Sequence, residues 1–375
     1  MKSPICDMFG IEFPLLAFSH CRDVVAAVSK AGGMGVFGAV NHTPEHLEEE
    51  LNWIDAHVDG KPYGLDLIVP TSSALGDGAP DKEALLAAVP QEHRDFANDV
   101  LAKGGVDSPI DADEAREHLF FADNLSSDGA GRALDVAFSH PIKLVVNALG
   151  VPPQIMLDRA RENGAKVGAL VGSARHAAKQ ADAGVDVLIA AGGEAGGHCG
   201  EVSTIVLVPE VVRAAKGVPV LAAGGIATGE QMAGMMAMGA AGAWCGSVWL
   251  TTTEAETSES VKAKMLTASS ADTVRSRSRT GKPSRQLRSP WTDAWETDGP
   301  NPLPMPLQTL VSEPALRKLD KLGDGGDQAA KALSTYWVGQ AVGLMNETES
   351  AAGVVQRFKE EFVEAYERLS GAIEG

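Results

Sequence analysis

Aromatic residues make up only 5% of this 375-residue chain, and its 32 Lys and Arg are outnumbered by 50 Asp and Glu. The resulting net charge of −18 disfavours general binding to nucleic-acid phosphates. The chain also lacks any uncharged apolar run of about 18 residues, and no long apolar segment opens it at residues 1–13. We therefore expect neither export nor a membrane span, and a cytoplasmic protein.

Cysteine is scarce, and no Cys-x-x-Cys pair occurs among Cys6, Cys21, Cys199 and Cys245. This spacing argues against a disulfide framework and against a zinc ribbon. Apolar residues nevertheless make up 44% of the chain and charged residues 22%, so a large core can be buried. One α/β barrel with insertions fits this length comfortably.

Short apolar runs alternate with amphipathic, alanine-rich runs along most of the chain. They predict eight strands, most of them followed by a helix. A (β/α)8 TIM barrel requires eight such units, whereas a doubly wound sheet rarely contains that many. The predicted strands are residues 13–18, 34–39, 63–69, 142–148, 165–171, 186–191, 218–225 and 241–247.

Two segments fall outside this repeat, which assigns the barrel to residues 1–70 and 141–272. Residues 71–140 are too long for an ordinary βα loop and predict a helical insertion over the barrel mouth. Residues 273–375 predict a C-terminal helical extension that completes this lid on the substrate side.

The start of the extension, residues 273–289, contains six basic residues and no acidic one. Two interpretations stay open: the cations hold an anionic substrate group, or they form a surface loop that pairs with acidic groups. The six residues are Arg275, Arg277, Arg279, Lys282, Arg285 and Arg288.

Glycines end the seventh and eighth predicted strands, where barrel enzymes commonly bind phosphate. Gly224, Gly225 and Gly246 would offer main-chain N–H groups with no side chain in the way, and Ser247 adds a hydroxyl donor. Plain tight turns are the alternative, but the same feature on both strands favours phosphate binding.

The loop after the sixth strand, AAGGEAGGHCGE (190–201), combines a histidine with closely spaced glycines. Glycines let a flat ligand approach the backbone, and an imidazole transfers protons near neutral pH. A structural histidine is the alternative; a metal site would need ligands beyond this loop, so we expect no metal. The residues concerned are Gly192, Gly193, Gly196, Gly197 and His198.

This glycine loop, followed at the right distance by AAGGI and a Gly-Ser turn, resembles the nitronate monooxygenase family, formerly called 2-nitropropane dioxygenases. Residues 24–39, YGLDL (63–67) and, more loosely, TGKPSRQLR and WVGQAVGL share the resemblance. The chain differs from the family where ring and substrate would sit. Ala191 replaces a usual Gln, the first strand ends in Ala17-Phe18-Ser19-His20 instead of Pro-Met, and the fourth ends in VNALG without an aromatic residue or histidine.

The resemblance implies an FMN-dependent oxidoreductase that converts an alkyl nitronate and dioxygen to a carbonyl compound and nitrite. It implies that His198 takes the α-proton of a nitroalkane or holds the nitronate. The oligomeric state stays open, a homodimer being one option. The implied FMN contacts are Gly224, Gly225, Gly246 and Ser247 for the phosphate, and Ala17, Phe18, Ser19, Asp66 and Asn147 around the ring.

Other functions stay open beside this one. The same family includes flavin-dependent enoyl-thioester and acyl-CoA oxidoreductases that use NAD(P)H, in which His198 would exchange a proton beside the thioester carbonyl. A sugar-phosphate enzyme without flavin would need a catalytic lysine at a strand end, whereas Lys143 and Lys166 stand at strand starts. A binding module without turnover is the last alternative. The GxGxxG at residues 33–38 ends a helix and begins a strand, the reverse of the dinucleotide fingerprint.

Overall fold

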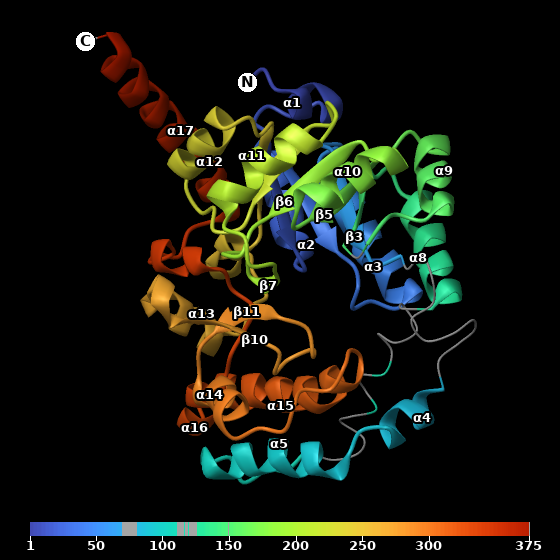
Figure 1. Cartoon of the computed structure of the whole chain (residues 1–375), viewed down its shortest axis with the longest axis vertical. Helices are drawn as coiled ribbons and strands as arrows, with labels where there is room; N and C mark the ends of the chain where they lie inside the picture. Colours follow the sequence, from blue (N-terminus) through green and yellow to red (C-terminus); the bar gives the residue numbers. More distant parts are fainter. Residues whose placement is uncertain (70–80, 111–115, 117–118, 120–125, 149, 375) are drawn as a thin grey trace.

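The computed structural model describes residues 1–69, 81–110, 116, 119, 126–148 and 150–374. Eight parallel strands close into a barrel in the order β1-β2-β3-β4-β5-β6-β8-β9, with helices around it (Figure 1). This confirms the predicted (β/α)8 fold, and each barrel strand overlaps one of the predicted apolar runs. The strands are β1 (Leu15–Ser19), β2 (Met34–Gly38), β3 (Tyr63–Leu67), β4 (Leu144–Asn147), β5 (Lys166–Val171), β6 (Val187–Ala191), β8 (Val220–Ala223) and β9 (Gly242–Cys245).

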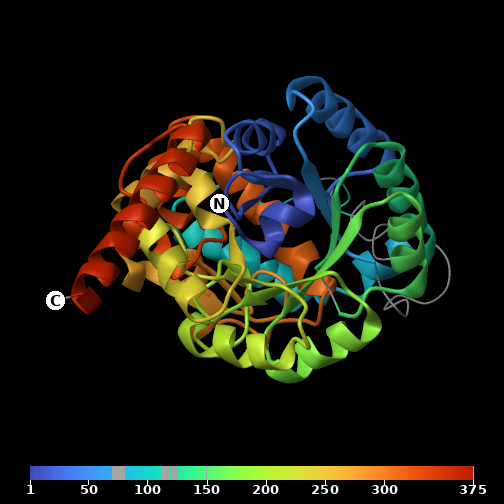
Figure 2. The same cartoon turned by 90° about the horizontal axis from the view of Figure 1, so that it is seen from above.

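A ring of helices covers the outside of the barrel. Side-chain caps start several of them; α3, for example, begins where the Thr43 hydroxyl accepts the His46 N–H. The last helix, α17 (Ala351–Glu374), packs against both α12 and α2 and so closes the ring (Figure 2). The other ring helices are α2 (Arg22–Lys30), α3 (Pro44–His57), α8 (Ser127–Ser139), α9 (Gln154–Glu162), α10 (Ala174–Ala183), α11 (Thr204–Ala214) and α12 (Gly229–Ala237).

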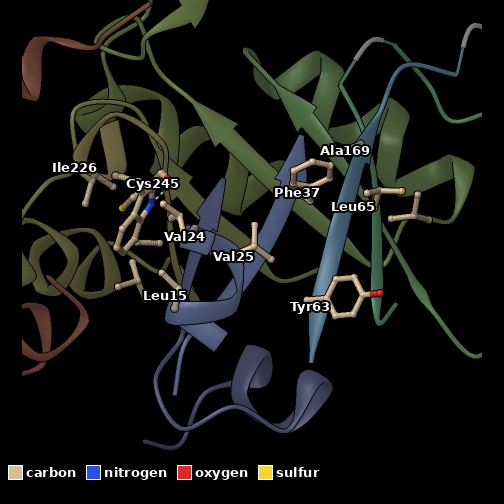
Figure 3. Packing of buried hydrophobic residues seen from close by; sticks show 14 of the residues in the cluster. Leu15, Val24, Val25, Phe37, Tyr63, Leu65, Ala169, Ile226 and Cys245 are labelled. Carbon is tan, nitrogen blue, oxygen red and sulfur yellow. Dashed lines mark hydrogen bonds between the residues drawn. The ribbon is translucent and has the colours of Figure 1, made fainter. Parts of the chain in front are cut away.

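The barrel core has two apolar layers, because successive side chains of a strand point to opposite faces. Leu16 and Val36 belong to the inner layer, together with side chains of α1 (Pro4–Phe9). Their sequence neighbours Leu15 and Phe37 belong to the outer layer, between strands and helices (Figure 3). This alternation fixes which residues at each strand end can face the barrel mouth.

A second apolar cluster lies apart from the barrel and joins helices from both of the segments outside the repeat. Leu101 of the insertion packs there with Trp291, Trp295 and Leu316 of the extension. Helix α8, although inside residues 71–140, packs instead in the barrel ring against α3. Parts of that range lie outside the described residues, so the limits of the insertion stay a prediction. The cluster involves α5 (Gln91–Lys103), α14 (Pro290–Thr297), α15 (Leu307–Asp324) and α16 (Gln328–Leu333), with α4 (Lys82–Ala87) beside them.

A small antiparallel sheet, which the sequence analysis did not predict, links the extension to the barrel. The hairpin of β10 (Thr273–Ser276) and β11 (Ser284–Leu287) adds to β7 (Gly197–His198), with Ser284 opposite His198. The basic segment therefore lies directly against the glycine loop. The remaining elements are α13 (Glu259–Thr267) and the 3-10 helices η1 (Ser247–Thr251), η2 (Ser270–Asp272) and η3 (Gln340–Leu344).

No helix in the described part of the chain is both long and apolar enough to span a membrane.

Candidate active site

A cavity of about 300 Å³ opens at the carboxyl ends of the barrel strands, where barrel enzymes carry out their chemistry. Its wall comes from the ends of β1, β3, β5, β6, β8 and β9, closed on one side by Trp337 of the extension. Of the predicted site residues, eight line it: Phe18, Asp66, Gly197, His198, Gly224, Gly225, Gly246 and Ser247.

One part of the wall, the glycine side, consists of Gly224, Gly225, Gly246 and Ser247. Gly224 and Gly225 have φ values of +96° and +72°, a left-handed backbone that favours glycine. The Ser247 hydroxyl accepts the Gly339 N–H at 2.8 Å, which leaves its own hydrogen for a ligand. The glycine side can thus offer main-chain and hydroxyl donors to an anion.

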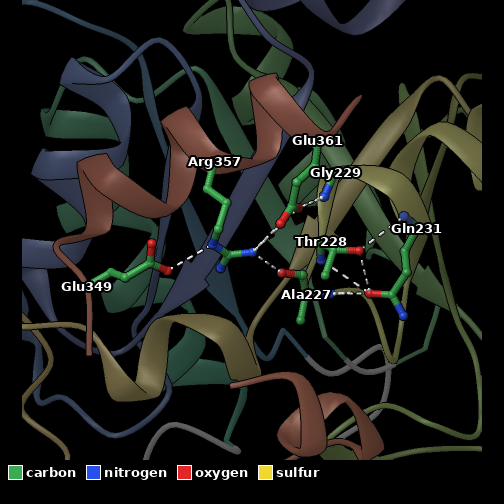
Figure 4. A network of polar contacts seen from close by, with 7 residues as sticks. All are labelled: Ala227, Thr228, Gly229, Gln231, Glu349, Arg357 and Glu361. Carbon is green, nitrogen blue, oxygen red and sulfur yellow. Dashed lines mark hydrogen bonds and ion pairs between the residues drawn. The ribbon is translucent and has the colours of Figure 1, made fainter. Parts of the chain in front are cut away.

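A polar network joins the start of α12 to α17 directly after this loop (Figure 4). The Gln231 amide donates to the Gly225 carbonyl at 2.8 Å and accepts the Ala227 N–H at 2.8 Å. The Glu361 carboxylate of α17 accepts the Gly229 N–H at 2.7 Å. The start of α12 therefore already carries a carboxylate, which favours the glycine side over α12 as the place for a phosphate.

Asp66, at the end of β3, is a buried acid that faces the cavity. Only 4% of its surface is exposed, and its Oδ1 has no hydrogen-bond partner among the described residues. Burial raises the pKa of this carboxyl well above its usual range. A polar group of a bound ligand would satisfy it, since buried polar atoms are rarely left unpaired.

Five predicted contacts do not line the cavity. Ala17 is fully buried between neighbouring strands. The Ser19 hydroxyl accepts the Cys21 N–H, and the buried Asn147 amide bonds the Val69 backbone through both its ends. The other two are Gly192 and Gly193, and for all five the role of cofactor contact stays a prediction.

The glycines of the loop after β6 make room for protein backbone more than for a flat ligand. A Cβ on Gly192 would lie 2.2 Å from the Thr204 hydroxyl, and one on Gly196 would lie 2.8 Å from the Gly339 nitrogen. The segment after Trp337 thus packs directly on this loop. Gly197, with φ of +72° and open space around it, is the glycine that turns the chain so that His198 meets the cavity.

His198 is exposed, and its exposed surface faces the cavity. Its Nε2 shares a 2.7 Å hydrogen bond with the Thr280 hydroxyl, whereas Nδ1 has no partner among the described residues. Desolvation, with Lys282 and Arg279 nearby, lowers the pKa of His198 to about 4. The imidazole is therefore neutral at pH 7, and its Nδ1 is available to a ligand.

The basic hairpin is neither a solvated loop nor a cluster of free cations. Arg279 forms a two-point ion pair with Glu313 at 2.6 and 3.2 Å, and its guanidinium lies 4.0 Å from the Trp337 ring centre. Arg275 pairs with Glu201, and Arg285 donates to the Gly193 carbonyl. These contacts favour the pairing interpretation. Lys282 is exposed, its backbone bonds the Thr280 hydroxyl, and its ammonium group has no hydrogen bond or ion pair among the described residues.

Sequence analysis missed Thr280 and Trp337 as cavity-side residues. The Thr280 hydroxyl shares a hydrogen bond with His198 Nε2, and the centre of the Trp337 ring lies 6.2 Å from the centre of the imidazole. The loosely similar stretches TGKPSRQLR and WVGQAVGL, which contain them, were the available signal. Lys143 and Lys166, needed by the sugar-phosphate alternative, do not line the cavity.

Thr280, His198 and Trp337, together with Gly197, form what we call the hairpin side of the cavity. All four lie where β7, the β10–β11 hairpin and the segment before η3 meet. Glu201 is committed to Arg275, so a metal site from His198, Cys199 and Glu201 gains no support.

Comparison with known proteins agrees with this geometry. A Mycobacterium tuberculosis protein named "Putative monooxygenase Rv1533" is 50% identical over 377 residues, covering 100% of both chains. The solved structure of a nitroalkane oxidase from Streptomyces ansochromogenes has a TM-score of 0.77 at 25% identity, covering 97% of this chain and 99% of that one. A second M. tuberculosis protein, a hydroxy-methyl-oxo-octahydro-indene-carboxyl-CoA dehydrogenase, is 27% identical over 79% of this chain and 69% of its own length.

The family model described as nitronate monooxygenase matches residues 2–361, nearly the whole chain. The enzymes of this family are flavin-dependent oxidoreductases. The chain is therefore an enzyme, and it belongs to the nitronate monooxygenase family.

Proposed function

We propose that this enzyme uses FMN and oxidises alkyl nitronates with dioxygen to a carbonyl compound and nitrite. The observation that carries the proposal is one cavity with donors for an anion on its glycine side and a neutral imidazole on its hairpin side. Family membership and the structural likeness to a nitroalkane oxidase support a nitro compound as substrate.

The residues fit FMN in three respects. Gly224, Gly225 and Gly246 line the cavity without side chains of their own, and Ser247 has a hydroxyl hydrogen to give, which suits a phosphate dianion. Asp66 offers an unpaired buried carboxyl to the polar edge of a ring. When bound, FMN would accept the electrons of the substrate and pass them to dioxygen.

The hairpin side suits an anionic substrate. A nitronate carries its negative charge on the nitro oxygens, and Lys282, which forms no ion pair among the described residues, supplies positive charge near His198. When the Thr280 hydroxyl donates to Nε2 of His198, Nδ1 carries the ring proton and can donate it to a nitronate oxygen. Trp337 covers this corner and limits the access of water, which strengthens each electrostatic contact.

An acyl-CoA or enoyl-thioester oxidoreductase using NAD(P)H is the second candidate. The CoA dehydrogenase among the relatives favours it. The hairpin contacts speak against it, because Arg275, Arg279 and Arg285 are committed to protein groups, and a CoA phosphate needs free cations. Lys282 alone would offer such a cation.

The test begins with the visible spectrum of the purified protein and identification of the released flavin by mass. We expect FMN, bleaching by anaerobic ethyl nitronate, and nitrite release in air. Bleaching by NADH with reoxidation by an enoyl-CoA, and none by nitronate, would establish the second candidate instead. A colourless protein that cannot be reconstituted with FMN would contradict both.

A further inference from the structure

Trp337 is the largest side chain on the hairpin side, and it borders both the cavity and a buried ion pair. The indole lines the cavity beside His198, with the two ring centres 6.2 Å apart. The guanidinium carbon of Arg279 lies 4.0 Å from the centre of the Trp337 ring. Arg279 is only 5% exposed and does not line the cavity, so the indole covers it there.

The Arg279 guanidinium holds the indole ring in place. Trp337 Nε1 has no hydrogen-bond partner among the described residues, so stacking and packing fix the ring. Arg279 is itself fixed, because its guanidinium forms the two-point ion pair with Glu313 of α15, at 2.6 and 3.2 Å. Attraction between a cation and an indole face favours this stacking. An ion pair of the extension thus determines where one wall of the cavity stands.

The backbone on both sides of Trp337 is anchored as well. The Tyr336 carbonyl accepts the Leu287 N–H of β11 at 2.9 Å. The Gly339 N–H donates to the Ser247 hydroxyl on the glycine side at 2.8 Å. The indole therefore forms a rigid wall, which a ligand can displace only by breaking the stacking contact.

The space in front of this wall is small. The whole cavity measures about 300 Å³, at the lower end of the range for small-molecule sites, and in the proposed function it holds FMN as well. A substrate whose nitro oxygens are held at His198 has the indole ring as its neighbour. Each methylene group added to the substrate has to find room against a ring that is held in place.

We propose that Trp337 is the specificity-determining residue of this enzyme and restricts its substrates to short-chain nitronates, with Arg279 as the positioning residue that holds the indole. The identity of the substrate rests on the proposed function. Trp337 transfers neither a proton nor an electron, so the reaction is the same for every substrate that fits. Its effect is a difference between substrates and is measured as a ratio of kcat/KM values.

The test compares ethyl nitronate with hexyl nitronate in the flavin-loaded enzyme, by nitrite release in air. We define the size ratio as kcat/KM for ethyl nitronate divided by kcat/KM for hexyl nitronate. Trp337→Ala should lower the size ratio by about 10²-fold, since room for methylene groups changes discrimination on this scale. Trp337→Phe retains a smaller ring and should give an intermediate ratio; it also serves alone if Trp337→Ala does not fold. A wild-type size ratio in these variants would overturn the proposal.

Carboxylate binding measures the same size limit without turnover. A carboxylate has the planar, three-atom anionic head of a nitronate but is not oxidised in this reaction. The flavin difference spectrum of the loaded protein, titrated with propanoate and with heptanoate, gives the two dissociation constants. Trp337→Ala should tighten heptanoate binding relative to propanoate by about 10- to 100-fold. The same ratio of constants in wild type and variant would contradict the size limit.

A matched control is Trp53→Ala, because Trp53 has a similar environment on α3. The Arg22 guanidinium carbon lies 4.7 Å from the centre of the Trp53 ring, and Arg22 pairs with Glu50 at 3.2 Å. Trp53 does not line the cavity. Both ratios should equal those of the wild type. A shift as large as that of Trp337→Ala would show that any such loss changes the ratios, and would also overturn the proposal.

Arg279→Met tests the positioning role. It removes the cation and keeps an apolar chain, and we expect it to lower the size ratio by about 3- to 10-fold. A merely structural loss would lower both kcat/KM values together and leave their ratio unchanged. Arg279→Lys, which retains a cation, should keep more of the wild-type ratio than Arg279→Met. An unchanged ratio in Arg279→Met would exclude Arg279 from this role.

The two proposals fail in different ways. If no nitronate releases nitrite while the carboxylate ratio still shifts in Trp337→Ala, only the proposed function is contradicted. If nitronates are oxidised with the same size ratio in the wild type and in Trp337→Ala, only the role of Trp337 is contradicted.

Discussion

The glycine side and the hairpin side of the cavity are built in opposite ways. On the glycine side, backbone groups at the ends of two adjacent strands are the proposed phosphate ligands, and Ser247 contributes a hydroxyl side chain. On the hairpin side, residues from segments around 197, 280 and 337 meet, and side chains supply the chemistry. Binding by local backbone and chemistry by distant side chains should therefore be separable by mutation.

The largest effect is expected for Gly225→Glu. The substitution would force a left-handed backbone, bring a Cβ within 2.9 Å of Glu194 Cβ and add a carboxylate where a phosphate would bind. Purified protein should lose essentially all of its visible flavin absorbance.

Gly217→Glu is the control for this variant, since Gly217 also has positive φ but has open space around it. It should retain flavin although it carries similar backbone strain. Full FMN occupancy in Gly225→Glu would show that the phosphate does not bind at the glycine side.

His198→Ala should show the reverse behaviour. The flavin absorbance should remain, while kcat/KM for a nitronate falls by about 10²–10⁴, the usual scale for a positioned proton-transfer or anion-holding group. Steady-state nitrite release measures this. If His198→Ala loses flavin absorbance together with turnover, flavin binding and catalysis are not separable between the two sides.

Ser247→Ala tests the glycine side more gently. Loss of one hydrogen bond to a charged group should weaken FMN binding by about 10- to 100-fold and leave turnover at saturating FMN nearly unchanged. Titration of the apoprotein by fluorescence quenching measures it, with the exposed Ser139→Ala as control. Unchanged affinity would mean that the backbone alone holds the phosphate.

The smallest effect concerns Asp320, in the helix behind the hairpin side. Burial raises the pKa of Asp320 from 3.8 to about 6, so folding takes up a proton between these values. The free energy of unfolding should therefore fall as the pH rises from about 4 to 6, by about 1–2 kcal/mol from this group. Asp320→Asn should lack that part of the pH dependence in urea titrations; an unchanged slope would exclude Asp320 as its source.

The same contrast explains how much the sequence could predict. The eight strands and the glycine ends follow from local patterns, because strand alternation and left-handed turns are decided by neighbouring residues. The pairing of Ser284 with His198 depends on segments far apart in the chain, and no local pattern fixes its register. For that reason Thr280 and Trp337 were missed, and the sequence could not show that Thr204 and Gly339 pack beside Gly192 and Gly196. The role of these two glycines as ligand contacts stays a prediction.

The position of α17 has a consequence for biosynthesis. This helix covers α2 and α12, yet it leaves the ribosome after all eight barrel strands. Until it docks, Phe358 and the apolar surface under it stay uncovered, and such surface promotes aggregation of unfinished chains. Nascent barrels of this type should therefore depend on chaperones until α17 has been synthesised.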